Sequence, residues 1–214
     1  MKNNRTALLN RYSRGRADGY LFYADSLDER TNNPLQIHAY LDLLSLFQNL
    51  GKPVTACRVG TLGLGFLCAG VDGMTSGIAS LSSFSESDLL QNRSTGYNMT
   101  RKYYIPDLML TLPVEMAQDI VGDRRNAHLR CQCVHCQGSS SGLDRIAKPH
   151  FLRVRTEEVE AINGINGTRD RLAWFIGRVA KAISHCEQIQ KQNIVNLSTG
   201  YYSHMKAWQQ VFGS

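Results

Sequence analysis

Three closely spaced cysteines constrain this chain more than any other feature of its sequence. They lie in Cys131-Gln-Cys133-Val-His-Cys136, separated by spacers of one and two residues. Zn²⁺ in proteins prefers four tetrahedral sulfur and nitrogen ligands, and such short spacers let the backbone turn around one ion. The motif therefore predicts three of the four ligands of a zinc site.

A nearby histidine would complete this zinc site. His150 follows the Ser- and Gly-containing stretch 137–148, which can fold back towards the ion, so we expect His150 to be the fourth ligand. The alternatives are His128, His185 or a water molecule. Three thiolates and a histidine saturate a tetrahedral ion, whereas a catalytic zinc keeps one position open. We therefore expect a structural zinc and no metal-dependent hydrolysis at the cysteines.

Composition favours a reduced protein with an anionic partner. Six cysteines in 214 residues is a modest density, whereas secreted disulfide frameworks are small and rich in cysteine. We find no targeting signal and no apolar run long enough for a membrane span, so we expect a cytoplasmic protein that makes no use of a membrane. The formal net charge of +6 fits contacts with the phosphates of tRNA or DNA.

Short apolar runs alternate with helical patterns in the first third of the chain. We expect strands at 19–25, 54–59 and 70–78, with helices at 34–50 and 60–69 between them. Strands separated by helices imply right-handed crossovers and a parallel sheet. The fold class is therefore α/β, with a partial (β/α) barrel-like parallel sheet, a zinc-binding loop and C-terminal helices.

Charged residues follow the predicted strands, where a parallel sheet carries its functional loops. Asp25, Asp28 and Glu29 come after the first strand, and Arg58 ends the second. We expect the carboxylates to act as acid or base and Arg58 to hold an anion. The alternative is structural: a carboxylate solvates its loop or pairs with Arg58. The serine-rich stretch 80–96 predicts a long loop that covers a site.

Four regions follow from these patterns. Residues 1–17 are a basic N-terminal segment, residues 18–122 hold the βα units, residues 123–155 are the zinc-binding loop, and residues 156–214 are helical. The acidic residues that follow Thr156 suit the first turn of a helix, because negative charge there complements the helix dipole. We therefore expect the first C-terminal helix to begin at Thr156.

Two short segments at the second and third predicted strands have a recognisable order. Arg58-Val-Gly-Thr61 is followed by Ala69-Gly-Val-Asp72, and the three cysteines come later in the chain. Over about residues 18–190, this order resembles the C-terminal half of tRNA-guanine transglycosylases. These enzymes are (β/α)₈ barrels with a zinc-binding region, and they exchange a guanine base for a deazaguanine. Phage- and defence-associated relatives act on DNA.

The resemblance implies a base-exchanging enzyme, with notable departures. The nucleophilic aspartate of the family, three residues after Asp72, would fall at Thr75, which cannot form the glycosyl-enzyme ester. Asp72 is the nearest carboxylate and becomes a further catalytic candidate. The zinc histidine of the family would fall at Ile162. Only about three strands precede the cysteines, and a half-barrel exposes two sheet edges. We therefore expect a partner chain or a second copy to complete the barrel.

Two functions are consistent with these features. The first is base modification of nucleic acid by a half-enzyme that needs a partner. The second is a non-catalytic, zinc-stabilised module that binds nucleic acid or protein. The lost nucleophile and the incomplete barrel fit the second function as naturally as the first.

Overall fold

A computed structural model describes residues 2–25, 27–77 and 101–213, so the predicted loop at 80–96 lies outside the described residues. Its first half contains α1 (Lys2–Ser13), β1 (Tyr20–Tyr23), α2 (Pro34–Gln48), β2 (Val54–Cys57), α3 (Leu62–Cys68) and β3 (Gly73–Met74). The second half contains β4 (Lys102–Ile105), η1 (Pro106–Leu108), β5 (Leu110–Pro113), α5 (Val114–Gly122), η2 (Arg124–Leu129), α6 (Leu143–Asn163), α7 (Thr168–Gln192), η3 (Thr199–Tyr201) and α8 (His204–Phe212).

The first three strands form one parallel sheet in the order β1-β2-β3. This confirms the α/β class and the predicted alternation of strands and helices. The third strand is shorter than predicted, because only Gly73 and Met74 pair with β2 as a regular ladder. Thr75 still donates its amide to the carbonyl of Ala56 at 2.8 Å, so the chain follows β2 for one more residue.

The start of α2 is set by its own first residues. The side chain of Asn33 accepts a hydrogen bond from the amide of Leu35 at 3.1 Å. Pro34 occupies the first helical position, where its missing N–H would have had no partner in the helix. Gly51, with φ +73°, takes the left-handed conformation that lets the chain leave the helix. The predicted helix is therefore confirmed to within two residues.

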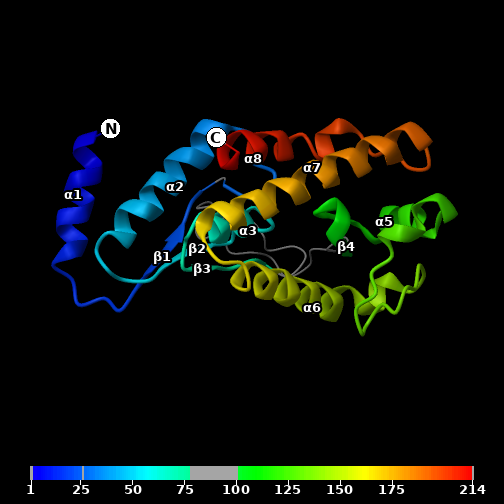
Figure 1. Cartoon of the computed structure of the whole chain (residues 1–214), viewed down its shortest axis with the longest axis horizontal. Helices are drawn as coiled ribbons and strands as arrows, with labels where there is room; N and C mark the ends of the chain where they lie inside the picture. The colour runs from blue at the N-terminus through cyan, green and yellow to red at the C-terminus, as the bar shows by residue number, and fades with distance from the viewer. Residues whose placement is uncertain (1, 26, 78–100, 214) are drawn as a thin grey trace, which may run out of the picture.

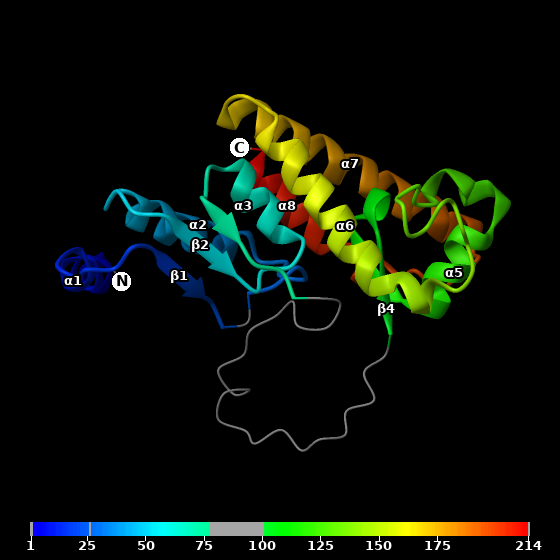
Figure 2. The same cartoon turned by 90° about the horizontal axis from the view of Figure 1, so that it is seen from below.

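One face of the parallel sheet is packed against α2, which lies beside it in Figures 1 and 2. The Phe47 ring of α2 lies 5.0 Å from the ring of Tyr20 and 4.7 Å from that of Phe22, both on β1. Alternate residues of a strand point to opposite faces. Leu21 and Tyr23 therefore point to the other face, where they are 67% and 50% exposed.

A hairpin and helices form the other end of the molecule. Strands β4 and β5 pair in antiparallel fashion, and η1 connects them. The strands expected from the sequence all lie before residue 79, so this hairpin was not predicted. Helix α6 runs along β4, and α7 lies beside α6 in Figure 2. Helix α8 packs against α7 through the rings of Phe175, Trp208 and Phe212, which are all buried.

The helix that carries His150 begins earlier than expected. Helix α6 starts at Leu143, so the prediction of a start at Thr156 is wrong, and the predicted region boundary falls inside this helix. Pro149 lies in its second turn and cannot donate a hydrogen bond to the carbonyl of Arg145. Arg145 is exposed, so water can satisfy that carbonyl. The buried face of α6 therefore extends N-terminally far enough to include His150.

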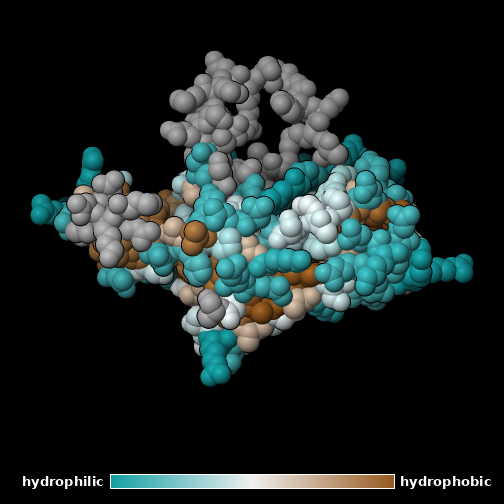
Figure 3. Space-filling view, turned by 90° about the horizontal axis from the view of Figure 1, so that it is seen from above, coloured by the Kyte–Doolittle hydropathy of each residue, from teal (hydrophilic) through white to brown (hydrophobic). Residues whose placement is uncertain are grey.

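The outer faces of the helices are polar. Figure 3 shows hydrophilic residues over most of one face, with hydrophobic areas between them. All six cysteines are free thiols. Among the described residues, none of the helices combines the length and the apolar character needed to cross a membrane.

The cap of α2 gives a direct test of the fold. Asn33→Ala should lower the free energy of unfolding by about 1 kcal/mol, because the amide of Leu35 loses its acceptor. The matched control is Asn32→Ala at the exposed preceding residue, which should change it by less than about 0.5 kcal/mol. Urea denaturation measures both. Equal effects of the two substitutions would contradict the capping role.

Candidate metal centre

The cysteine segment folds into two tight turns. The carbonyl of Cys133 accepts hydrogen bonds from the amides of Cys136 at 3.0 Å and Gln137 at 2.9 Å, and the carbonyl of Cys131 accepts one from Gly138 at 3.0 Å. Gln137 and Gly138 both adopt left-handed conformations, with φ +48° and +75°. The turn that the first of these bonds closes brings Cys133 and Cys136 close together, and the two left-handed residues then turn the chain away after Cys136.

The structure gathers these three cysteines around His150. Their sulfur atoms and one ring nitrogen of His150 all lie within 4.8 Å of one another. Nδ1 of His150 is 3.2 Å from Sγ of Cys136 and 3.6 Å from Sγ of Cys133. His150, Cys136 and Cys133 are buried, whereas Cys131 is partly exposed. This Cys₃His cluster could hold a metal ion, and it is the one such group of three or more ligands in the described part of the chain.

A backbone contact fixes the orientation of the His150 ring. Its Nε2 lies 2.7 Å from the carbonyl oxygen of Tyr104 in β4. A carbonyl can only accept, so Nε2 carries the proton and donates it. Nδ1 therefore presents its lone pair to the three sulfurs, as a metal ligand requires. Strand β4 sets the histidine tautomer, although it supplies none of the four ligand atoms.

Tyr103, the preceding residue of β4, covers the buried side of the cluster. Its ring stacks on that of His150 with centroids 4.3 Å apart and planes 8° from parallel. Burial raises the pKa of Tyr103, so its hydroxyl stays protonated and donates to Sγ of Cys136 at 3.1 Å. Such a bond favours the charged form of the sulfur.

The thiols also affect one another. A hydrogen bond between Cys131 and Cys136 raises the pKa of Cys131 to about 12, and the same bond lowers the pKa of Cys136. Cys131 is therefore the thiol that keeps its proton, and it donates a hydrogen bond to the sulfur of Cys136. A bound dication would remove this proton, because the thiolate is the form that coordinates metal.

The two other candidate histidines pair with each other instead. Nε2 of His128 lies 3.4 Å from Nδ1 of His185 on α7, outside the Cys₃His cluster. Burial and the neighbouring His128 lower the pKa of His185. Of the three histidines weighed from the sequence, only His150 is brought to the sulfurs, because the early start of α6 places it opposite the cysteine turn.

Two of the candidate catalytic residues lie together at the carboxyl edge of the parallel sheet. Oε2 of Glu29 accepts hydrogen bonds from the amide and the hydroxyl of Thr61, at 3.3 and 3.2 Å. Arg58 ends β2 in a left-handed conformation, with φ +57°, and its amide donates to the hydroxyl of Thr75 at 3.0 Å. Thr75, which stands at the position of the nucleophilic aspartate of the transglycosylases, therefore also lies at the carboxyl edge of the sheet.

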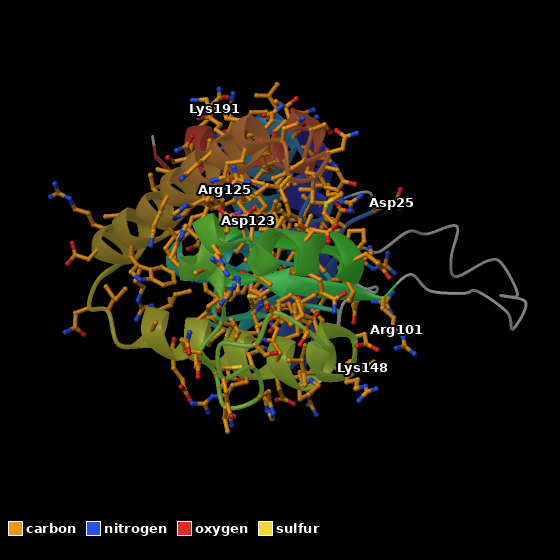
Figure 4. The ribbon with its side chains drawn as sticks, turned by 90° about the vertical axis from the view of Figure 1, so that its right-hand side faces the viewer. Asp25, Arg101, Asp123, Arg125, Lys148 and Lys191 are labelled. Atoms are coloured by element: carbon orange, nitrogen blue, oxygen red, sulfur yellow. The ribbon has the colours of Figure 1, made fainter. Side chains whose placement is uncertain are left out.

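The remaining candidates occupy different places. Asp25 follows β1 at the same edge and is labelled in Figure 4. Oδ1 of Asp28 accepts from the amide of Arg30 at 2.8 Å, which closes a local turn. Oδ2 of Asp72 accepts from the amide of Val54 at 2.9 Å. Val54 begins β2, so Asp72 lies at the opposite edge of the sheet from Glu29.

A buried ionic network, not foreseen from the sequence, connects the sheet edge to the helices. Arg155 of α6 donates to the hydroxyl of Thr61 at 3.1 Å and forms an ion pair with Glu158 at 3.0 Å. Glu158 also accepts from Arg178 of α7 at 2.7 Å and from Tyr104 at 3.0 Å. Charges are almost never buried without partners. The available signal was the spacing of His150, Val154 and Glu158, which share one helix face.

Removing His150 tests the cluster. His150→Ala should lose tightly bound metal, because three sulfurs alone leave one coordination position to water. A protease should then cleave the variant within 130–142 sooner than it cleaves the parent protein, because the loop would lose the metal that holds it. His135→Ala is the matched control, since His135 lies in the same turn but is exposed and outside the cluster. Metal content after dialysis and limited proteolysis measure both effects. Full metal retention by His150→Ala would refute the assignment.

Comparison with known proteins finds no significant match to this chain. No family model matches the sequence, no curated protein is significantly similar to it, and no solved structure significantly resembles its fold. What can be said of function therefore comes from the arrangement of residues described above.

Proposed function

We propose that this chain is a transglycosylase-like, zinc-containing protein that acts in nucleic-acid base modification as part of a barrel completed by another polypeptide. The exposure of β1 on one face of the parallel sheet carries this proposal. Parallel sheets in proteins are covered on both faces, yet Leu21 and Tyr23 are 67% and 50% exposed. In a (β/α)₈ barrel this face would point inward and pack against side chains of other strands.

The two edges of the sheet fit the same proposal. In the part of the chain that the structure describes, β1 and β3 each pair with β2 alone. A barrel has no open edges, because every strand has two neighbours. Further parallel strands beside β1 and β3, from a partner chain or a second copy, would close the sheet and fill its interior.

The ligand geometry supports zinc as the metal. With bonds of about 2.3 Å to sulfur and about 2.0 Å to nitrogen, a tetrahedral zinc would hold the two atom types about 3.5 Å apart. The observed distances from Nδ1 of His150 are 3.6 Å to Cys133 and 3.2 Å to Cys136. Zinc would supply four fixed bonds here and leave no position for substrate. Its role would be to hold the cysteine turn against α6 and β4.

The chemistry of base exchange would then belong to the carboxyl edge of the sheet. Asp25, Glu29 and Arg58 are gathered there, as functional residues are in barrel enzymes. The hydroxyl of Thr75 accepts from the amide of Arg58, and it cannot replace a carboxylate as the nucleophile of a glycosyl ester. A carboxylate contributed by the completing polypeptide is the simplest substitute.

A second function is a non-catalytic module that binds nucleic acid. The observation in its favour is that Asp28, Asp72 and Thr75 all serve as acceptors for backbone amides. Exposed Arg101, Arg145 and Lys148 could contact phosphates, and Figure 4 shows Arg101 and Lys148 near the same side of the molecule. Arg101 also pairs with Asp144 at 2.7 Å, within one turn of α6 from Lys148.

The purified chain should contain about one zinc per molecule, because the four ligands saturate one tetrahedral ion. Metal analysis of protein prepared without chelator measures the ratio. A content below about a tenth of an equivalent, with all three thiols freely reactive, would refute the zinc assignment.

The chain by itself should not incorporate guanine into tRNA, because no glycosyl-enzyme ester can form at Thr75. We would incubate it with tRNA and labelled guanine, alone and with any protein encoded immediately upstream. Incorporation that needs both proteins would support the proposal. Incorporation by this chain alone would instead direct attention to Asp72.

Inactivity of both mixtures would favour the second function. In that case the chain should bind RNA or DNA with an affinity that falls steeply as salt rises, since phosphate contacts release counterions. A fluorescence titration at several salt concentrations measures this dependence.

A further inference from the structure

The metal centre can be approached from one side. A groove of about 530 Å³ runs between the cysteine segment, α6 and α7, and both Cys131 and Cys133 contribute to its wall. Cys131 is partly exposed, whereas Cys133 and Cys136 are only 9% and 2% exposed. A small solute in the groove would therefore meet the sulfur of Cys131 before the other two.

The opposite side of the cluster is closed by protein. His150 is fully buried, the Tyr103 ring stacks on it, and the Tyr103 hydroxyl contacts Cys136. Nε2 of His150 is engaged by the carbonyl of Tyr104. The four candidate ligands thus differ sharply in accessibility, and the most accessible of them is the sulfur of Cys131.

We propose that Cys131 is a site of oxidation by peroxides, reached through this groove, and that its oxidation releases the metal. The inference rests on the metal centre proposed above and does not depend on base exchange. Reactive cysteines are accessible thiolates, whereas buried structural ones are inert. A zinc-bound Cys131 satisfies both conditions, because coordination keeps its sulfur deprotonated.

The chemistry balances in two steps. The Cys131 thiolate attacks one oxygen of hydrogen peroxide, the O–O bond breaks, and hydroxide leaves to give a sulfenic acid. The thiolate of Cys136, whose sulfur lies within 4.8 Å of that of Cys131, then attacks the Cys131 sulfur and displaces hydroxide. A disulfide forms, two cysteines have lost two electrons, and the peroxide has gained them.

Release of the metal follows from the loss of two ligands. Only Cys133 and His150 would remain, too few for a stable tetrahedral site. The cysteine turn would then lose its attachment to α6, since metal-binding free energy acts as folding free energy for such a segment. Oxidation at Cys131 would thereby loosen the region between η2 and α6.

The experiment follows zinc and thiols together in the full chain. Protein of measured zinc content is treated with hydrogen peroxide, and zinc release is recorded with a chromogenic chelator. Sulfenic acid is trapped with a dimedone probe, and mass spectrometry of the tryptic peptide 131–145 locates the modified sulfur. We expect the first label on Cys131, followed by zinc release and a disulfide that includes Cys131.

A groove variant separates access from coordination. Ala161 lines the groove on α6, so Ala161→Trp should narrow it and slow zinc release several-fold without removing a ligand. Ala180→Trp on the exposed face of α7, outside the groove lining, is the control and should react at the parent rate.

The possible failures are distinguishable. A first label on Cys133 or Cys136, zinc release with all thiols intact, or equal rates for the two tryptophan variants would overturn the proposal. Protein that contains no zinc before treatment would refute the metal centre itself, and the oxidation proposal with it.

Discussion

The hydrogen bond from His150 to the backbone of β4 is the interaction on which this part of the molecule depends. It fixes the proton on Nε2, so Nδ1 faces the three sulfurs. It also ties α6, which carries His150, to the hairpin that carries Tyr103 and Tyr104. The cysteine turn has little apolar core of its own, so its place depends on these contacts. A metal ion held by the cluster would add to them, because a small segment cannot bury enough surface to order itself.

Helix α6 also connects the candidate metal centre to the parallel sheet and to α7. Two turns beyond His150, the same helix carries Arg155 and Glu158, which connect to Thr61 at the sheet edge and to Arg178 of α7. Breaking a buried ion pair by removing one partner costs about 3–5 kcal/mol, because the remaining charge is stranded. The network therefore specifies how α6 lies relative to the sheet more than it adds to stability. Helix α6 therefore contacts both the candidate metal centre, through His150, and the carboxyl edge of the parallel sheet, through Arg155.

Short-range patterns in the sequence predicted much of this arrangement. The βα alternation, the length of α2 and the grouping of Cys131, Cys133 and Cys136 depend on local spacing, which a sequence displays directly. The early start of α6 and the β4-β5 hairpin depend on packing between distant segments. Thr156 has acidic neighbours that imitate a helix start, whereas the true start at Leu143 has no side-chain cap. The hydrogen bond that Asp72 accepts from Val54, eighteen residues away, likewise depends on how distant segments pack.

The parallel sheet is unevenly covered. Its first strand, β1, presents Leu21 and Tyr23 to solvent on one face, whereas α2 covers the other face. Parallel sheets occur almost only with both faces covered, since their crossovers normally place layers on both sides. At the other end, both strands of the β4-β5 hairpin are covered by helices, and the four candidate metal ligands come from this chain alone. The less covered end is the one that carries Glu29, Arg58 and Thr75 at the carboxyl edge of the sheet. If a partner completes the sheet as proposed, it would also complete the surroundings of these residues.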